Sequence, residues 1–383
     1  MMEGIVWETP LNPPKREDYV FKDGKRLVKP YFFEFICNVK NRWAGKTVVD
    51  LFAHEFRQRP RDYYVTAVEA GRIQVDGTRV DVTYTVKSSQ RISHFVHRHE
   101  PPVMEWNISV LKKEDDLVTV FKPPSIPVHP CGQYRKNTVL GILQAEHGLT
   151  PLFLHRLDRL VSGLLILARS AARADLFRQQ IEGGKVRKEY VAKVIGVFPE
   201  AEQVVDAAII FDAREGRSSV EAVTDDDTSS QKGKLACTKF NRISTNGVHS
   251  IVKCEPITGR THQIRVHLQH LGHPIANDSL YFSEAYSHFL VKPLNDSPSI
   301  GSMEQPAKRS KSSLSGQISN HLSGYKELDV DEDFVIDPMC TNCPNFPPNG
   351  YDEHEEGLWL HCVRYSGPDW TYECPYPEWA SIR

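Results

Sequence analysis

The order of apolar patterns along this chain of 383 residues is consistent with an α+β fold class. Short apolar runs bounded by glycine or charged residues indicate buried strands, whereas apolar residues three or four positions apart indicate helices. Strands are expected at residues 117–121, 164–168, 189–197 and 358–365. Helices are expected at 138–147 and 171–182. This patterning gives the class but does not by itself name a fold.

The composition is typical of a soluble globular protein, with 40% hydrophobic and 25% charged residues. No window approaches ~18 uninterrupted apolar residues, so we expect no transmembrane helix and no membrane partner. The N-terminus lacks the patterns of a secretion signal and of an organelle transit peptide. We therefore expect an intracellular protein, cytoplasmic or nuclear.

The net charge of −2 conceals an asymmetry between two regions. Residues 37–100 carry 11 Lys+Arg against 7 Asp+Glu, a balance of +4, whereas residues 325–383 carry 3 against 13, a balance of −10. A basic region at one end hints at a polyanionic partner, and a solvated charged face is the alternative.

The basic region is expected to fold as a small module. Apolar spacing predicts one helix from Gly45 that Pro60 stops and a second helix over 62–71, and the Asp-Gly turn within 73–80 predicts a hairpin. Alternation over 80–86 predicts a further strand. Helices, hairpin and polar arginines resemble the alpha-L RNA-binding motif, although its Arg-Leu-Asp opening is absent. Such a module contacts phosphates and orients RNA, and a packing domain is the alternative. Its candidate RNA contacts are Arg57, Arg59 and Arg61.

The stretch from His155 to Gly163 contains a carboxylate in an informative place. Asp158 lies between two arginines, and the apolar run that follows predicts a buried strand. Asp158 is therefore expected on a loop that leads into a rigid core element, where a catalytic residue is usefully placed. Taken alone, the pattern also describes an ordinary salt-bridged loop.

Three further stretches carry polar residues near expected strands and helices. The segment 122–130 is rich in proline, which fixes its backbone after a strand. Tyr190 lies in the middle of a strand, where a tyrosine usually packs in the core. Thr261 can cap a helix that places Arg265 in its first turn. The histidines of this helix lack the spacing of a metal site.

Together these stretches resemble RNA pseudouridine synthases of the RluA type. The motifs occur in the family's order, namely 122–130, His155-Arg156-Leu157-Asp158, Lys188-Glu189-Tyr190, and 259–265 with Gly272-His273-Pro274-Ile275. The resemblance implies that family's catalytic fold, which is a long, mixed, mostly antiparallel sheet with flanking helices. It also implies isomerisation of uridine to pseudouridine in RNA, either tRNA or rRNA, without a cofactor.

The resemblance assigns roles to individual residues. Asp158 is the expected catalytic group, acting as nucleophile toward the anomeric carbon or as base on the sugar. Arg265 is its expected partner, and Tyr190 is expected to stack on the uracil. Because the uridine must be flipped out of a stacked helix, Arg156 is expected to fill the vacated space. The remaining expected RNA contacts are His155, Lys122, His129, Arg260 and His262.

Domain boundaries are expected from the resemblance and from composition. They give an N-terminal arm (1–36), the alpha-L-like module (37–100), the catalytic domain (105–290), a disordered linker (291–330) and an acidic C-terminal segment (331–383) that returns to the catalytic domain. The insertion resembles eukaryotic members. We expect a monomer that binds RNA.

The pair Cys340 and Cys343 is not required by the catalytic fold. We expect no metal, and an alternative is a structural zinc site completed by His354, His361, Cys362 or Cys374, which one Cys-x-x-Cys pair supports only weakly. A zinc-dependent base deaminase is a further alternative, although its motif halves would be in reversed order. A third alternative is an inactive RNA-binding protein of the same fold.

Overall fold

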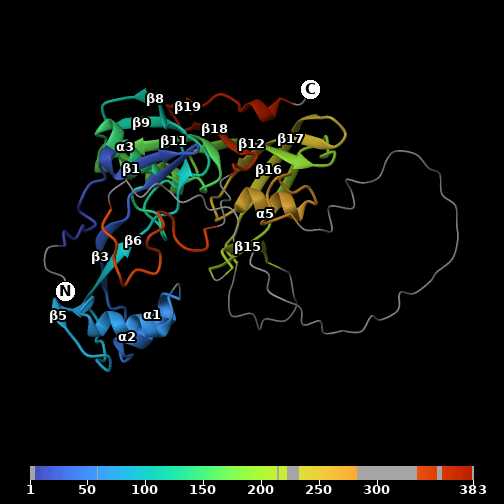
Figure 1. Cartoon of the computed structure of the whole chain (residues 1–383). Coiled ribbons are helices and arrows are strands. Elements are labelled where there is room, and N and C mark those ends of the chain that lie inside the picture. Colours follow the sequence, from blue (N-terminus) through green and yellow to red (C-terminus); the bar gives the residue numbers. More distant parts are fainter. Residues whose placement is uncertain are drawn as a thin grey trace, which may run out of the picture. The chain divides into compact units, whose positions relative to one another are not determined.

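The computed structural model describes residues 5–57, 59–213, 215–221, 233–282, 334–351 and 356–381 (Figure 1). The linker expected at 291–330 and the candidate ligand His354 lie outside these ranges. Within them, no helix is long and apolar enough to cross a membrane.

A ten-stranded sheet carries the motifs. Its strands are β8 (Ser109–Lys113), β9 (Leu117–Lys122), β10 (Leu152–Phe153), β11 (Ser162–Ala168), β12 (Arg187–Ile195), β13 (Gln203–Asp206), β16 (Cys237–Thr245), β17 (His249–Pro256), β18 (Leu360–Ser366) and β19 (Thr371–Glu373). The main path runs β13, β16, β17, β12, β18, β11, β9, β8, with β10 beside β11 and β19 beside β18. Only the β11–β18 ladder is parallel among these described strands. The α+β class and the mostly antiparallel mixed sheet are confirmed, and the four predicted strands lie within two residues of their expected ends.

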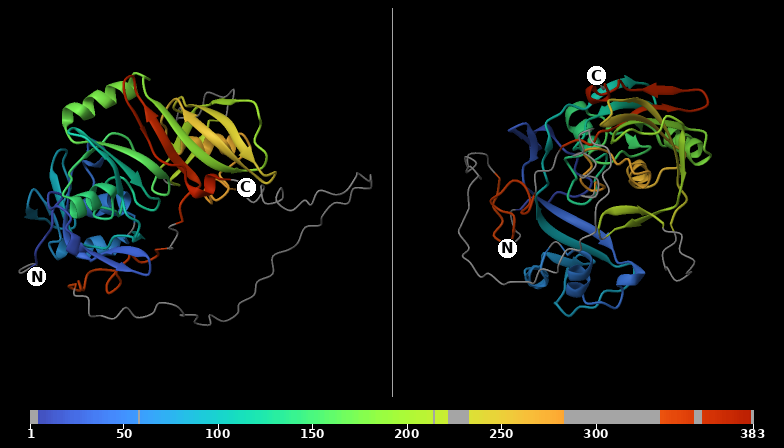
Figure 2. Two further views of the ribbon diagram at one scale, coloured as in Figure 1. Left: turned by 90° about the horizontal axis from the view of Figure 1, so that it is seen from above. Right: turned by 90° about the vertical axis from the view of Figure 1, so that its right-hand side faces the viewer.

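Strand β18, from the C-terminal part of the chain, lies between β11 and β12, as the long red strand in the left view of Figure 2 shows. Gly163 makes this close approach possible, because a Cβ there would lie 2.3 Å from the carbonyl oxygen of Cys362. Its φ of 115° also favours glycine. Strand β11 therefore joins the Asp158 loop directly to a segment about two hundred residues further along the chain.

Both faces of β11 are buried, which explains its unbroken apolar run. Leu164 and Ile166 pack into one core with α4 (Ala171–Glu182) and α5 (Gln263–His270). Leu165 and Leu167 point to the opposite face and pack into a second core with α3 (Val139–His147). The predicted helices at 138–147 and 171–182 are confirmed, and Thr138 and Ser170 cap them.

The residues expected as an N-terminal arm contain regular structure. Strands β1 (Tyr19–Lys22) and β2 (Lys25–Val28) form a three-stranded sheet with β7 (Val103–Met104). Val28 is fully buried in the second core. The other short elements are β14 (Ile209–Asp212), its partner β15 (Arg217–Val220), and the 3-10 helices η1 (Arg16–Asp18), η2 (Asn41–Trp43) and η4 (Glu378–Ala380).

The N-terminal module combines two helices with a four-stranded sheet. Its elements are β3 (Tyr31–Asn38), α1 (Val48–Glu55), α2 (Arg61–Glu69), β4 (Ile73–Val75), β5 (Thr78–Arg79) and β6 (Arg91–Arg98), with strand order β3, β6, β4, β5. The two helices and the hairpin are confirmed. The strand predicted at 80–86 is wrong, because the chain turns around Asp81, whose carboxylate accepts the N–H of Thr83, and only an isolated bridge from Thr85 to Thr47 follows. Alternate apolar residues there pack on the module core without a ladder.

Candidate active site

A cavity of about 580 Å³ opens where the Asp158 loop, β12 and the start of α5 meet. Its lining brings together Asp158, Tyr190 and Arg265, the three expected catalytic residues. The expected RNA contacts that also line it are His129, His155, Arg156, Arg260 and His262. Such a cavity has the size and mixed lining of a small-ligand site.

Lys122 holds the Asp158 loop in place from the interior of the protein. Its side chain is fully buried, and Nζ donates hydrogen bonds to the carbonyl oxygens of Pro123 (2.9 Å), Arg159 (3.0 Å) and Val161 (2.7 Å). Burial lowers the pKa of Lys122 to about 7. The expectation that Lys122 contacts RNA does not fit this position, because its three donors are used inside the protein. It ties the end of β9 to the loop instead.

Arg265 lies between two carboxylates. Its Nε and Nη2 donate to Asp278 at 2.6 and 2.8 Å, and its Nη1 lies 3.5 Å from Oδ2 of Asp158. Burial opposes the charge of Arg265, but the hydrogen bonds and charge of Asp278 outweigh it and raise the pKa. Asp278 is fully buried, whereas the side chain of Asp158 is 35% exposed. Arg265 is thus held by one carboxylate and orients the other, which stays accessible from the cavity.

His262 approaches the same carboxylate from the N-cap of α5. Its Nε2 lies 3.7 Å from Oδ2 of Asp158, and its Nδ1 lies 2.8 Å from the hydroxyl of Tyr281. That hydroxyl accepts the N–H of Ser218 (2.8 Å) and keeps its own proton to donate to Nδ1, an arrangement that places the proton of a neutral ring on Nε2, facing Asp158. Burial lowers the pKa of His262, which favours this neutral form.

The backbone of His262 is left-handed, with φ 56°. For a residue other than glycine this conformation is costly, and it occurs preferentially at functional sites. The predicted cap Thr261 is wrong, because His262 is the N-cap and no side chain caps the helix. The strained turn aims the imidazole at Asp158.

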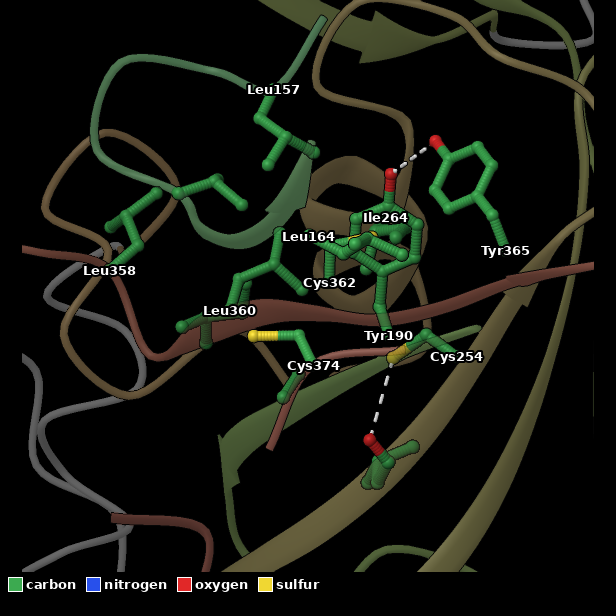
Figure 3. Packing of buried hydrophobic residues seen from close by; sticks show 14 of the residues in the cluster. Leu157, Leu164, Tyr190, Cys254, Ile264, Leu358, Leu360, Cys362, Tyr365 and Cys374 are labelled. Atoms are coloured by element: carbon green, nitrogen blue, oxygen red, sulfur yellow. Dashed lines mark hydrogen bonds between the residues drawn. The ribbon is translucent and has the colours of Figure 1, made fainter. Parts of the chain in front are cut away.

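Tyr190 forms part of the buried wall of the cavity. Its hydroxyl lies 3.0 Å from that of Tyr365 on β18, the contact drawn as a dashed line in Figure 3. Burial, with Tyr365 beside it, raises the pKa of Tyr190, so the phenol remains protonated. Tyr365 is in turn stacked on His155, with ring centroids 4.4 Å apart.

His155 supports this tyrosine pair. Its Nε2 accepts the N–H of Ile166 at 3.1 Å. Burial, and then the charge of Lys188, lowers the pKa of His155 to about 3, so the ring is neutral. His155, which was expected to contact RNA, thus supports Tyr365 at the edge of the cavity.

The rim and walls of the cavity are cationic. Among the described lining residues, Asp158 is the only carboxylate, and the cations are Arg156, Arg159, Lys188, Arg260 and Arg265. Arg156 and Arg260 are exposed. His129 stacks on the exposed Phe153, with ring centroids 4.7 Å apart. This lining suits a ligand that combines phosphates with a planar base.

The module arginines do not line the cavity. Arg57 is exposed, and its Nε donates to the carbonyl oxygen of His54. Arg59 lies over the ring of Tyr63, 4.3 Å from its centroid. Arg61 pairs with Asp50 at 3.1 Å. Their contact with RNA remains a prediction.

The four-cysteine alternative for zinc is wrong. Cys362 and Cys374 are buried in the core beside Tyr190 (Figure 3). Cys340 and Cys343 lie instead beside His97 and His99. Burial in a packed core removes the first two from any common site with the other pair.

Several site residues were not predicted. Asp278, Tyr281 and Tyr365 each touch a predicted residue, but none stands in a motif that marks it as functional. Lys188 was quoted only as part of a motif, although it lines the cavity. A buried carboxylate thirteen residues from an arginine gives no local sequence signal.

Comparison with known proteins agrees with this geometry. Residues 116–270 match the family model described as RNA pseudouridylate synthase. The chain is 61% identical to RNA pseudouridine synthase 7 of Oryza sativa, over 99% of this chain and 96% of that protein. It is 40% identical to the mitochondrial tRNA pseudouridine(32) synthase of Saccharomyces cerevisiae, over 94% and 77%. It is 35% identical to the tRNA pseudouridine(31) synthase of that yeast, over 94% and 96%.

Proposed function

Because this chain belongs to the family of RNA pseudouridine synthases, which isomerise uridine in RNA, we propose that its cavity receives a flipped-out uridine and that Asp158 is the catalytic residue. One observation supports this most directly. Asp158 is the only carboxylate among the described lining residues, and a buried arginine orients it. Its side chain is 35% exposed toward the cavity, so it can reach a bound sugar.

The reaction needs a group that acts at the ribose. The bond between N1 of uracil and C1′ breaks, the base turns, and C5 bonds to C1′ while its proton is lost and N1 gains one. The carboxylate of Asp158 can attack C1′ as a nucleophile or remove a proton from the sugar as a base. Arg265 fixes its orientation, and Asp278 fixes Arg265.

Tyr190 and its neighbours hold the base. We propose that the ring of Tyr190 faces the uracil while the Tyr365 hydroxyl fixes the phenol. The protonated phenol can take part in the proton transfer at C5. His155 stabilises Tyr365 by stacking, which gives it an indirect role.

The rim of the cavity binds the RNA strand. Arg156 is exposed beside Asp158 and is placed to occupy the space that the uridine leaves. Arg260 and Lys188 are available for neighbouring phosphates. Arg57, Arg59 and Arg61 of the alpha-L-like module would orient the RNA without reading its sequence.

We propose tRNA as the substrate, with target uridines at positions 31 or 32. The names of two yeast relatives that align along most of this chain support this choice. The test incubates the purified chain with transcribed tRNAs and maps pseudouridine by position. An inactive RNA-binding protein would give no product, and a deaminase would give a changed base instead.

The acting form is a monomer inside the cell. Light scattering of the chain alone and with tRNA measures its mass, and a dimer would contradict the proposal. A fluorescent fusion of the full chain distinguishes cytoplasm, nucleus and mitochondrion.

A further inference from the structure

A second cluster of reactive side chains lies away from the cavity. It consists of His97, His99, Cys340 and Cys343, whose donor atoms all lie within 4.8 Å of one another. Nδ1 of His97 is 3.2 Å from Sγ of Cys343 and 3.2 Å from Nε2 of His99. Sγ of Cys343 is 3.5 Å from the same Nε2. Both histidines are buried, and both cysteines are partly buried free thiols.

The three separations of 3.2, 3.2 and 3.5 Å are close to the edges of a tetrahedron around zinc, and the remaining donor pairs lie within 4.8 Å. Zn–N bonds of about 2.0–2.1 Å and Zn–S bonds of about 2.3 Å place neighbouring tetrahedral donors about 3.3–3.8 Å apart. Two imidazoles and two thiols are also a donor set that zinc prefers in structural sites. The four side chains therefore have the donor types and approximate spacing that a structural zinc site requires.

Local structure brings the two histidines together on one strand end and the two cysteines together in one turn. His97 on β6 and His99 just beyond it are two positions apart in extended chain, so their side chains lie on one face. Cys340 and Cys343 lie in a turn in which the Cys340 N–H donates to the Asp337 carbonyl (2.9 Å). The N–H of Asn342 points at Sγ of Cys340 (3.4 Å), as often occurs around metal-bound thiolates.

A carbonyl group orients one imidazole. Nδ1 of His99 lies 3.1 Å from the carbonyl oxygen of Phe346 and must carry the proton to donate there. Nε2 is then unprotonated on the side that faces the cluster. Histidines that bind zinc typically donate their other N–H in this way.

An independent ion pair brings the two halves together. Asp337 accepts two hydrogen bonds of 2.9 Å from Arg72, and both side chains are buried. Met339 packs against the core of the N-terminal module. The segment 334–351 is thus docked on the module by contacts that do not involve the four candidate ligands.

We propose that His97, His99, Cys340 and Cys343 bind one zinc ion in a closed tetrahedral site. Four protein ligands leave no open position for water, so the site is structural. The zinc fastens the segment 334–351 to the end of β6, joining parts of the chain 241 or more residues apart. It is separate from the reaction, which takes place in the cavity lined by Asp158.

The metal content of the full chain tests the proposal. We expect one zinc per chain after purification under reducing conditions without a metal-affinity tag, measured by mass spectrometry of the elements. The double variant Cys340→Ser with Cys343→Ser, and separately His97→Gln with His99→Gln, should lose that zinc. The matched control is Cys237→Ser, which changes a partly buried cysteine on β16 and should retain it. Asp337→Asn weakens docking but keeps all four ligands and should also retain zinc.

The wild-type chain provides a test that does not depend on folding of variants. The reduced protein is stripped with a chelator and titrated with cobalt, which should give thiolate-to-cobalt and tetrahedral absorption bands that saturate at one equivalent and disappear on adding zinc. The proposal is overturned if reduced wild-type protein holds no zinc and gives no such bands. It is also overturned if the double cysteine variant keeps its zinc, or if Cys340 and Cys343 are disulfide-bonded in the protein as isolated.

Discussion

The two clusters of polar residues in this molecule are held together in different ways. At the cavity wall, the guanidinium of Arg265 lies between the carboxylates of Asp158 and Asp278, so attraction between opposite charges holds this cluster together. Beside β6, two histidines and two cysteines converge, and each offers one potential ligand atom for a metal ion. Removing a member of a buried ion pair leaves an uncompensated charge, which costs stability and disturbs the neighbouring carboxylate. Removing a donor from the His–Cys cluster should loosen the segment 334–351 and leave the reaction in the Asp158 cavity unaffected.

The largest effect is expected from Asp158→Asn. The amide has the shape of the carboxylate but cannot act as nucleophile or base, so we expect turnover to fall by at least about a thousandfold. RNA affinity and unfolding temperature should stay near wild type, since Asp158 is partly exposed. Pseudouridine is quantified in a single-turnover assay with tRNA.

The control for this variant is Asp175→Asn, which removes an exposed carboxylate paired with Arg178 on α4. It should leave turnover unchanged. Residual turnover of Asp158→Asn close to wild type would remove Asp158 from the catalytic role.

Asp278→Asn should reduce activity and stability together. Loss of the carboxylate leaves the guanidinium of Arg265 buried without its bidentate partner, which should cost about 3–5 kcal/mol of unfolding free energy. Arg265 is then free to shift from Asp158, and we expect turnover to fall by about 10- to 100-fold. Urea unfolding and single-turnover rates measure both. If the unfolding free energy falls by about 3–5 kcal/mol while turnover is unchanged, Asp278 does not position the catalytic pair.

His155, which stacks on Tyr365 at the cavity wall, should make the stability of the protein decrease in acid. The folded pKa of His155 is about 3, whereas an unfolded histidine has a value of about 6.5. Between these values the unfolded chain binds a proton that the folded chain does not, so stability falls as pH drops from 6.5 toward 3. The contribution is at most about 1.4 kcal/mol per pH unit.

His155→Gln should remove that contribution from the pH dependence of unfolding free energy. The control is His54→Gln, which makes the same substitution at a histidine whose side chain is 60% exposed. Equal slopes in wild type and His155→Gln would mean that His155 is not buried as a neutral ring.

The sequence allowed much of the catalytic region to be predicted. Strand β11 is buried on both faces and so appears as a continuous apolar run, and the motifs around Asp158 and Arg265 stand at spacings that resemble a known family. The pairing of these two residues, 107 positions apart, is observed at 3.5 Å. The local chemistry of the loop was less predictable, because a lysine after a strand gives no sign of whether it faces RNA, as expected, or three carbonyls, as found for Lys122.

The His–Cys cluster could not be assembled from the sequence. A Cys-x-x-Cys pair identifies half a site, but its partners depend on which strand the segment docks against. Here the docking depends on the Arg72–Asp337 ion pair, which joins positions 265 residues apart. Cys362 and Cys374 stand closer in sequence and were weighed as ligands, yet strand pairing buries them in the catalytic core.

Arg156→Ala should separate the two kinds of arginine in the cavity. Arg156 is exposed at the rim, whereas Arg265 is buried against two carboxylates. We expect about a tenfold loss in kcat/KM on tRNA, because flipping becomes less favourable, with the unfolding free energy unchanged. Arg265→Lys should instead lower kcat and stability. If the two variants behave alike, the proposed division between RNA contact and support of Asp158 is wrong.

The smallest effect on turnover is expected from the double variant Cys340→Ser with Cys343→Ser. Loss of the cluster should speed proteolytic cleavage within 334–351, because that segment is then docked mainly by the Arg72–Asp337 pair. Tyr365 follows the segment 334–351 in the sequence, but the pairing of β18 with β12 holds Tyr365 independently of the cluster. We therefore expect kcat within about threefold of wild type. A loss as large as that of Asp278→Asn would mean that the His–Cys cluster and the cavity form one cooperative unit, because strain at residues 340–343 would then reach Tyr190 through β18.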